Sequence, residues 1–312
     1  MRYNKAMKAE EFTIKSNHDG LELGVSLRIP EHPRGILQIV HGMAEHRERY
    51  HDFMDYCAER GLIVIIHDHR GHGASAKTEA DYGYFGKDGT NGIIADVHQV
   101  TEYLKNRFPG LPLTLFGHSM GSLVVRCYMQ EYDADVNGLI VCGSPSKRLG
   151  AGAGKFLAKF LQLFHDDHHR SGFINKLAFG NYNKRFTDSK SPNSWIVSDP
   201  AVVEAYDADT RDGFVFTLNG FATLFGLIKR AYRKTGWKMR NPNAPIFFIA
   251  GEDDPCIISP KDFAKAVNFM KNRGYENVES KLYPGMRHEI LNEVGKAEVW
   301  RDVVDWIDTN IL

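Results

Sequence analysis

Three residues have the types and the chain order needed for acyl transfer by a serine hydroxyl. Ser119 comes first, an acidic residue near 254 follows, and His288 comes last. A serine hydroxyl is a poor nucleophile at neutral pH, so an imidazole must accept its proton and later protonate the leaving group. A carboxylate must fix the imidazole tautomer and stabilise its charged form. We therefore predict a triad of Ser119, His288 and an aspartate.

The Gly-x-Ser-x-Gly segment at Ser119 has the context of a sharp turn between a strand and a helix. Residues 113–116 have strand character, and residues 122–132 are compatible with a helix. At such a turn the serine takes a strained backbone that exposes its hydroxyl at the carboxyl edge of a sheet. A side chain on Gly117 or Gly121 would collide with the adjoining strand or helix. This context favours Ser119 as the nucleophile.

Two neighbouring carboxylates compete for the acid position. The strand before them ends in Gly251-Glu252-Asp253-Asp254-Pro255, a loop at a carboxyl strand end, where function sits in open α/β sheets. The acid of such triads commonly lies on a turn three residues after the glycine that closes the strand, and a proline follows it. Asp254 fits this spacing, and Asp253 is interpreted as a solvated turn carboxylate.

Two backbone N–H groups are expected to stabilise the oxyanion. Met120 supplies one because it directly follows the nucleophile. Met43 supplies the other, because it follows His41-Gly42 in the loop after the apolar strand 35–40. Only the backbone dipoles of these residues act, so neither side chain is expected to take part in the chemistry.

A doubly wound, mostly parallel α/β sheet must position these loops. Apolar strand runs alternate with helical patterns, and a continuous apolar run such as 62–66 is typical of a strand covered on both faces. Asn17-His18-Asp19-Gly20 predicts a hairpin before this alternation. Right-handed crossovers then gather the functional loops at the carboxyl ends of the strands. The expected strands are 11–15, 21–29, 35–40, 62–66, 113–116, 138–142, 245–250 and 278–283, and the expected helices are 48–60, 93–108, 122–132, 261–273 and 296–310.

The alternation stops for about a hundred residues in the middle of the chain. Residues 144–243 contain no clean buried strand, but they have helical patterns and many aromatic residues. We interpret this segment as a helical cap inserted into the sheet domain. The domain is then made of residues 1–143 and 244–312.

Two apolar stretches of the cap are candidates for an acyl pocket. One is centred on Phe160, with the spacing of a single helical face, and the other is centred on Phe221. They either fill the core between cap and sheet or line a ligand site, since such sites are mostly apolar. Phe160 and Phe221 are therefore named as candidate substrate contacts. The glycines of 150–154 predict a hinge before the first stretch.

Four segments resemble those of one known family. Together they are similar to the monoacylglycerol lipase and lysophospholipase group of α/β-hydrolases, over roughly residues 10–145 and 244–312. The resemblance implies the α/β-hydrolase fold and hydrolysis of ester bonds without a metal or organic cofactor. The matching segments are His41-Gly42-Met43-Ala44-Glu45-His46-Arg47-Glu48-Arg49-Tyr50, Asp68-His69-Arg70-Gly71-His72-Gly73, Gly117-His118-Ser119-Met120-Gly121 and Tyr283-Pro284-Gly285-Met286-Arg287-His288-Glu289.

Composition excludes several other classes of protein. The 39 Lys and Arg balance 39 Asp and Glu, so no strong field favours nucleic acid or an anionic membrane. No run nears the ~20 apolar residues of a membrane span, and Met1 to Glu11 lacks the apolar run of a signal peptide. The four cysteines are scattered and fit neither a zinc site nor a disulfide framework. We expect a cytoplasmic protein that contacts lipid only transiently, through the cap.

Most other reactive side chains have a simpler interpretation. His118 is expected in the pocket wall, and Glu45 and His46 are expected to order the oxyanion loop by hydrogen bonds. The run His165-Asp166-Asp167-His168-His169 could hold a metal, but its spacing matches no standard helical ligand pair, so we favour a solvated turn and predict no metal site. Cys256 is expected to pack near the site.

The sequence thus predicts a serine hydrolase of lipid-like acyl esters that forms an acyl-enzyme intermediate. Its substrates would be of the monoacylglycerol or lysophospholipid type. A small-ester esterase or arylesterase with the same triad is one alternative. A proline-aminopeptidase-like peptidase and a non-catalytic ligand-binding module are others, because the fold alone does not fix function.

Overall fold

The computed structural model describes residues 7–147, 150–186 and 191–312. Its centre is one eight-stranded sheet in the order β1-β2-β4-β3-β5-β6-β7-β8. The pairs β1–β2 and β2–β4 are antiparallel, and all other pairs are parallel. This arrangement confirms the doubly wound, mostly parallel sheet. The strands are β1 Met7–Lys15, β2 Glu22–Pro30, β3 Gly35–Val40, β4 Leu62–His67, β5 Leu113–His118, β6 Gly138–Cys142, β7 Ile246–Gly251 and β8 Val278–Tyr283.

The central strands are apolar because helices cover both of their faces. Every residue of β3, β4, β5, β6 and β7 is buried. The edge strand β1 instead alternates between exposed and partly buried residues. It begins at Met7, four residues before the expected start, because it pairs with β2 along its whole length. Alternating polar residues hid that extension from the sequence pattern.

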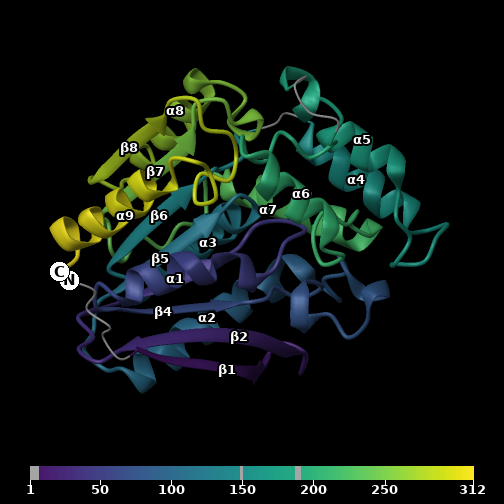
Figure 1. Cartoon of the computed structure of the whole chain (residues 1–312). Coiled ribbons are helices and arrows are strands. Elements are labelled where there is room, and N and C mark those ends of the chain that lie inside the picture. The colour runs from purple at the N-terminus through teal and green to yellow at the C-terminus, as the bar shows by residue number, and fades with distance from the viewer. Residues whose placement is uncertain (1–6, 148–149, 187–190) are drawn as a thin grey trace.

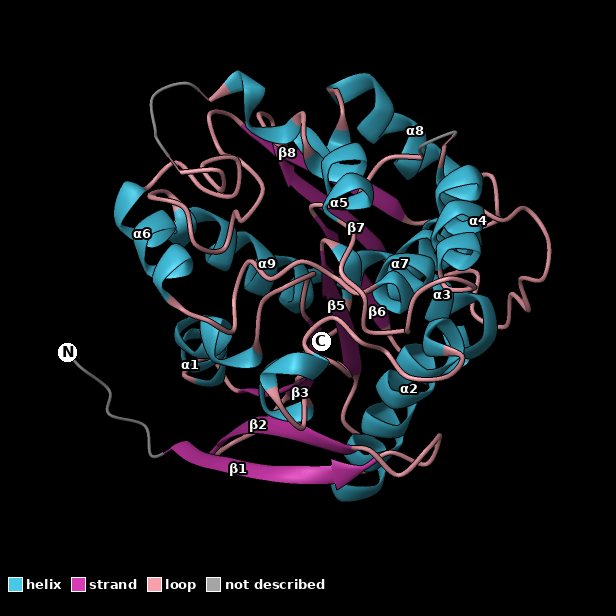
Figure 2. Ribbon diagram, turned by 90° about the vertical axis from the view of Figure 1, so that its right-hand side faces the viewer, coloured by secondary structure: helices cyan, strands magenta, loops and turns pink. Residues whose placement is uncertain are grey.

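Two helical layers sandwich the sheet. Side chains of α1 and α9 pack on one face, and side chains of α2, α3 and α8 pack on the other. Figure 2 shows the two groups on opposite sides of the strands. Helix α2 begins four residues before the expected start. The α-helices are α1 His51–Ala58, α2 Gly89–Arg107, α3 Met120–Tyr132, α4 Ala151–Leu161, α5 Gly172–Phe179, α6 Pro200–Ala208, α7 Leu218–Ala231, α8 Pro260–Lys271 and α9 Lys296–Asn310.

Between β6 and β7 the described residues form helices α4, α5, α6 and α7 and one short 3-10 helix, Tyr182–Arg185, without a strand. In Figure 1 these helices lie together at one end of the sheet, separate from the α1 and α9 layer. Helix α7 is almost wholly buried and packs against α3. The segment therefore has the helical character expected for residues 144–243.

Helix α4 presents a different face to the protein from the expected one. It packs closely on α7 through its small residues Ala151, Gly154 and Ala158, and a Cβ on Gly154 would lie 2.9 Å from the Phe225 ring. Small side chains allow this close approach, so the aromatic stripe turns outward and Phe156 is 72% exposed. The expected glycine hinge is also wrong for Gly152 and Gly154, because α4 begins at Ala151 and includes both.

Candidate active site

The structure brings Ser119, His288 and Asp254 together from three loops at the carboxyl edge of the sheet. His288 Nε2 lies 2.8 Å from Ser119 Oγ, and His288 Nδ1 lies 2.8 Å from Asp254 Oδ2. Asp254 is fully buried, and its Oδ1 accepts the Cys256 amide at 2.7 Å. This is the hydrogen-bonded chain that nucleophile, base and orienting carboxylate require. The neighbouring Asp253 does not contact His288. Its side chain is 46% exposed, and its Oδ1 lies 3.7 Å from Arg185 Nη2.

The backbone at Ser119 has the strained geometry expected of this turn. Its φ is 51° and its ψ is −117°, a conformation that L-residues rarely adopt. The two glycines are required by close backbone contacts. A Cβ on Gly121 would lie 2.0 Å from the Val40 carbonyl oxygen, and one on Gly117 would lie 2.5 Å from the Gly121 carbonyl oxygen. The strand–turn–helix packing therefore exposes the hydroxyl of Ser119.

A cavity of about 540 Å³ opens above Ser119. Both methionines expected to supply oxyanion N–H groups, Met43 and Met120, line it together with His118. Its volume lies within the usual range for small-molecule sites. Much of its wall comes from helices α5 and α7 and the loop at Trp195, whose ring lies 5.1 Å from that of His288.

The two phenylalanines named from the sequence do not line this cavity. Phe160 is 46% exposed on the outer face of α4, and Phe221 is fully buried in the core of α7. The neighbouring α7 residues Leu224, Phe225 and Ile228 line the cavity instead. The sequence therefore identified helix α7 as part of the pocket but chose a residue on its core-facing side. Helix α7 is buried on almost all sides, so its apolar pattern does not distinguish core residues from pocket residues.

Glu45 holds the loop of residues 41–46 after β3 to the rest of the site. We call this segment the oxyanion loop, after the role predicted for Met43. Its Oε1 accepts hydrogen bonds from the Gly42 amide and from the Tyr50 hydroxyl, and it lies 3.2 Å from His118 Nδ1. Burial alone would raise the pKa of Glu45, but the bond with His118 and the charge of Arg49 lower it to about 2. Glu45 is therefore an anion that fixes the loop, as expected.

His118 is the imidazole partner of this carboxylate. Burial opposes its charged form, but the hydrogen bond and charge of Glu45 outweigh burial and raise the pKa of His118. Its Nε2 lies 3.3 Å from the His288 carbonyl oxygen, so the same imidazole contacts both the oxyanion loop and the triad loop. His118 also lines the cavity, as the sequence predicted.

Arg49 joins the triad loop to the oxyanion loop and to the segment after α6. Its guanidinium forms two hydrogen bonds with Glu289, next to His288, and one with Glu45. Its Nε lies 3.4 Å from Asp212. Tyr206 stacks against the same guanidinium. The sequence contains no spacing that pairs Arg49 with Asp212 or Glu289, so sequence analysis did not predict these contacts.

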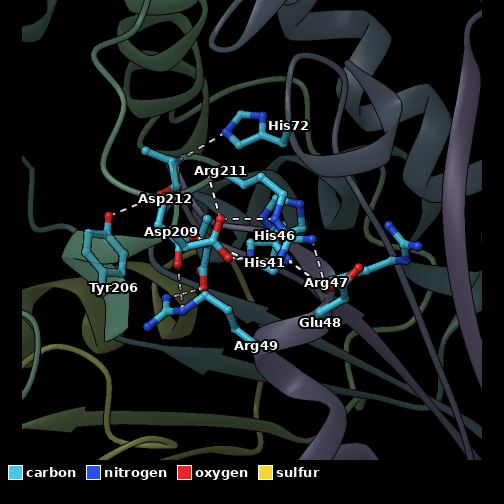
Figure 3. A network of polar contacts seen from close by, with 12 residues as sticks. His41, His46, Arg47, Glu48, Arg49, His72, Tyr206, Asp209, Arg211 and Asp212 are labelled. Carbon is cyan, nitrogen blue, oxygen red and sulfur yellow. Dashed lines mark hydrogen bonds and ion pairs between the residues drawn. The ribbon is translucent and has the colours of Figure 1, made fainter. Parts of the chain in front are cut away.

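The end of α6 and the segment after it reach the oxyanion loop directly, as Figure 3 shows. The Tyr206 hydroxyl and the Gly213 amide both donate to the Ala44 carbonyl oxygen, at 3.1 and 2.9 Å. Ala44 has a φ of 50°, so these two bonds support a residue in the left-handed region. His72 Nε2 accepts the Ala44 amide at 3.2 Å, so the loop after β4 also supports this residue.

The exposed run 165–169 does not form a metal-binding group. The rings of His165 and His169 stack on each other, and His168 pairs with Asp81 and stacks on Tyr84. Among the described residues, two other groups of His, Cys and Asp could hold a metal ion: Asp254 with Cys256 and His288, and His46 with Asp209 and Asp212.

Residues 31–295 match the sequence model of the family described as serine aminopeptidase, S33. The chain belongs to this family. The S33 match confirms the resemblance to α/β-hydrolases, and the chain is therefore an enzyme of the hydrolase class. The monoacylglycerol lipase of Mycolicibacterium smegmatis is 28% identical over 280 residues, covering 89% of this chain and 90% of the relative. The monoglyceride lipase homolog of monkeypox virus is 25% identical, covering 88% and 90%.

Two solved structures have the same architecture. A thermostable carboxyl esterase from Bacillus coagulans, solved with glycerol, superposes with a TM-score of 0.91 at 28% identity, covering 98% of this chain and 100% of that chain. A monoglyceride lipase variant from Saccharomyces cerevisiae superposes with a TM-score of 0.71 at 19% identity, covering 99% and 96%. The second likeness concerns the fold alone.

No helix in the described part of the chain is both long enough and apolar enough to cross a membrane.

Proposed function

We propose that this enzyme hydrolyses lipid-like carboxylic esters, of the monoacylglycerol or lysophospholipid type, through an acyl-enzyme on Ser119. The observation that carries the proposal is the hydrogen-bonded chain Ser119–His288–Asp254 at the floor of a largely apolar cavity. The monoacylglycerol lipase relatives and the carboxyl esterase structure support an ester rather than a peptide substrate.

Catalysis begins when Ser119 Oγ attacks the ester carbonyl carbon. His288 Nε2, 2.8 Å away, accepts the hydroxyl proton and then donates it to the leaving alcohol oxygen. Asp254 keeps the Nδ1 proton in place and stabilises the imidazolium. A water molecule then attacks the acyl-enzyme, with His288 again as base, and releases the carboxylic acid and free Ser119.

The oxyanion formed in both steps would be bound by the N–H groups of Met43 and Met120. One lies in the loop after β3 and the other begins α3, beside the nucleophile. Losing one such donor typically costs about 10²–10³ in kcat. Because the donors belong to the backbone, the contacts of Glu45 and Ala44 that hold the Met43 loop matter more than the methionine side chains.

The cavity wall supports an acyl chain as the bound group. Phe179, Leu224, Phe225 and Ile228 supply apolar surface from α5 and α7. Burying a methylene is worth about 0.8 kcal/mol, so each two methylenes that fit should raise kcat/KM about tenfold.

Contact with lipid would occur through helices α4 and α5. Phe156, Phe164, Phe173 and Leu177 are all more than 60% exposed on or just after these helices, of which α5 lines the cavity. We expect this apolar surface to touch lipid aggregates transiently, without inserting into a bilayer. Sedimentation with phosphatidylcholine vesicles should decrease for Phe156→Ser, and equal sedimentation would contradict this contact.

All four cysteines are buried, and the thiols of Cys57, Cys127 and Cys142 are free. This supports the expectation of a cytoplasmic enzyme, because reducing compartments keep thiols free.

The decisive experiment is hydrolysis of p-nitrophenyl esters from acetate to laurate. We expect a burst of p-nitrophenol, rising kcat/KM with chain length until the cavity is full, and complete loss in Ser119→Ala. A fluorophosphonate should label Ser119 alone. A kcat/KM that falls steadily from the acetate ester upward would favour the small-ester alternative. Cleavage of prolyl p-nitroanilides without ester hydrolysis would favour a peptidase. Binding of an ester without turnover would indicate a binding module.

A further inference from the structure

The second group with metal-binding potential lies between the oxyanion loop and the segment after α6. His46 comes from the oxyanion loop, and Asp209 and Asp212 lie just beyond the end of α6. Figure 3 shows the three side chains gathered around one point, with Arg211 and Arg49 at the sides. The proposed reaction does not use this cluster.

The ligand atoms have the spacing of a compact cation site. His46 Nε2 lies 3.2 Å from Asp209 Oδ2 and 3.7 Å from Asp212 Oδ1, and all three atoms lie within 4.8 Å of one another. Zinc bonds of about 2.0–2.2 Å to nitrogen and oxygen in a tetrahedron place neighbouring ligands roughly 3.3–3.5 Å apart. The His46 separations fall near this value, and a water molecule can complete the fourth position.

Two of the buried polar atoms in this cluster have no hydrogen-bond partner. They are Asp212 Oδ1, which faces His46 Nε2, and His46 Nδ1. The side chains of Asp212 and His46 are 3% and 4% exposed, respectively. A buried carboxylate oxygen without a donor costs free energy, which a bound cation would remove.

The charge balance also favours a cation. Five carboxylates meet at this interface: Glu45, Glu48, Asp209, Asp212 and Glu289. Arg49 and Arg211 are the guanidinium groups shared among them, and His118 lies against Glu45. Arg47 is paired with Asp68 instead. Carboxylates therefore outnumber the guanidinium groups at this interface, and a divalent ion would supply further positive charge there.

Arg211 does not have to leave for an ion to bind. Its Nε donates to Asp209 Oδ1 and its Nη1 to Glu48, and both contacts can persist when Asp209 Oδ2 turns to a metal. The contacts of Asp209 Oδ2 with Arg211 Nη2 and with His46 Nε2 would be exchanged for bonds to the ion.

We propose that His46, Asp209 and Asp212 form a structural site for a divalent transition-metal ion, with zinc as the best fit, that fastens the segment after α6 to the oxyanion loop. The mixed imidazole and carboxylate donor set suits zinc better than calcium or magnesium, which prefer oxygen ligands alone. The ion would add a third link beside the Tyr206 and Gly213 bonds to Ala44. It has no role in the acyl transfer itself.

The test is zinc titration of the chelator-treated full-length protein by calorimetry, together with its thermal unfolding. We expect one zinc ion per chain and a Tm that rises with zinc concentration, because an ion that binds only the folded state stabilises it. Asp212→Asn and His46→Gln should each weaken binding by about 10–100-fold or more and abolish the rise in Tm. Asp212→Asn keeps the shape of the side chain, so it should fold.

Two control variants separate this site from the alternatives. The double variant His165→Gln/His169→Gln removes the exposed histidine pair, and Cys256→Ser removes the thiol 3.8 Å from His288 Nε2. Both should retain one zinc ion and the rise in Tm. The proposal would be overturned if the wild type bound no zinc or if either control lost zinc binding. It would also be overturned if zinc binding survived in both Asp212→Asn and His46→Gln. Substituting Co²⁺ should give the visible absorption of a four-coordinate site in the wild type and not in Asp212→Asn.

Discussion

Asp254 Oδ2 lies 2.8 Å from His288 Nδ1, and its carboxylate has no exposed surface. The adjacent Asp253 has almost half of its side chain in solvent. Asp254→Asn should therefore lower kcat by about 10⁴, because the imidazole would lose its orienting acceptor and take the wrong tautomer. Asp253→Asn should leave kcat nearly unchanged. Steady-state kinetics on one chromogenic ester checks both, and the reverse order of effects would move the acid to Asp253.

Gly121 is a position where even one methyl group should not fit. A Cβ there would meet the carbonyl oxygens of Val40 and His41 at 2.0 and 2.5 Å. Gly121→Ala should lower the free energy of unfolding by about 1–3 kcal/mol or more and remove activity. The matched control is Gly152→Ala, because nothing lies within 4 Å of its Cβ inside α4. That change should stabilise the protein by about 0.5–1 kcal/mol in urea unfolding. Equal stability of the two variants would contradict the packing at the turn.

Ile228 should limit the acyl chain length that the cavity accepts. Ile228→Phe adds volume to the wall, so the chain length that gives the highest kcat/KM should become shorter, with about tenfold lower efficiency for each two methylenes excluded. Hydrolysis of the acetate ester should hardly change. Phe160→Ser is the control, because Phe160 lies outside the cavity and is 46% exposed. A chain-length profile altered by the control and not by Ile228→Phe would place the acyl group elsewhere.

The ion pair between Glu45 and His118 should make stability depend on pH. The pKa of His118 is raised in the folded state, so its contribution is full below its usual value of 6.5 and is lost as pH rises through the folded pKa. The pKa of Glu45 is lowered to about 2, so its contribution is full above 4.5 and is lost as pH falls toward 2. The pair is therefore strongest between about pH 4.5 and 6.5.

A double-mutant cycle with Glu45→Gln and His118→Asn measures this directly. Urea unfolding at about pH 6 should give a coupling free energy of about 1.5–3 kcal/mol, the usual size for a hydrogen bond to a charged group. The coupling should shrink well above the raised His118 pKa and again near pH 3. A coupling that stays constant over this range would show that the two groups do not form an ion pair.

The local geometry of the nucleophile could be predicted from sequence because it depends on neighbours in the chain. Glycines two residues before and after Ser119 are needed wherever a strand turns sharply into a helix, and the structure has that turn, with Ser119 at φ 51°. The buried strands were readable for a similar reason, since a strand covered on both faces must be apolar throughout. Ser119, Asp254 and His288 could be predicted to meet because each follows a parallel strand, and the carboxyl ends of these strands lie at one edge of the sheet.

The contacts between the central helical segment and the sheet domain were decided only in three dimensions. Phe160 and Leu224 are both apolar residues on helical patterns, yet one faces solvent and the other the cavity. Phe160 faces solvent because the small residues of α4 lie on the opposite side of this helix and let α4 pack closely on α7. The contacts of Arg49 with Glu289 and Asp212 likewise join residues far apart in sequence, through the packing of two loops. Short-range patterns determine which segments form strands and turns, but the face that each helix buries depends on the partner it meets.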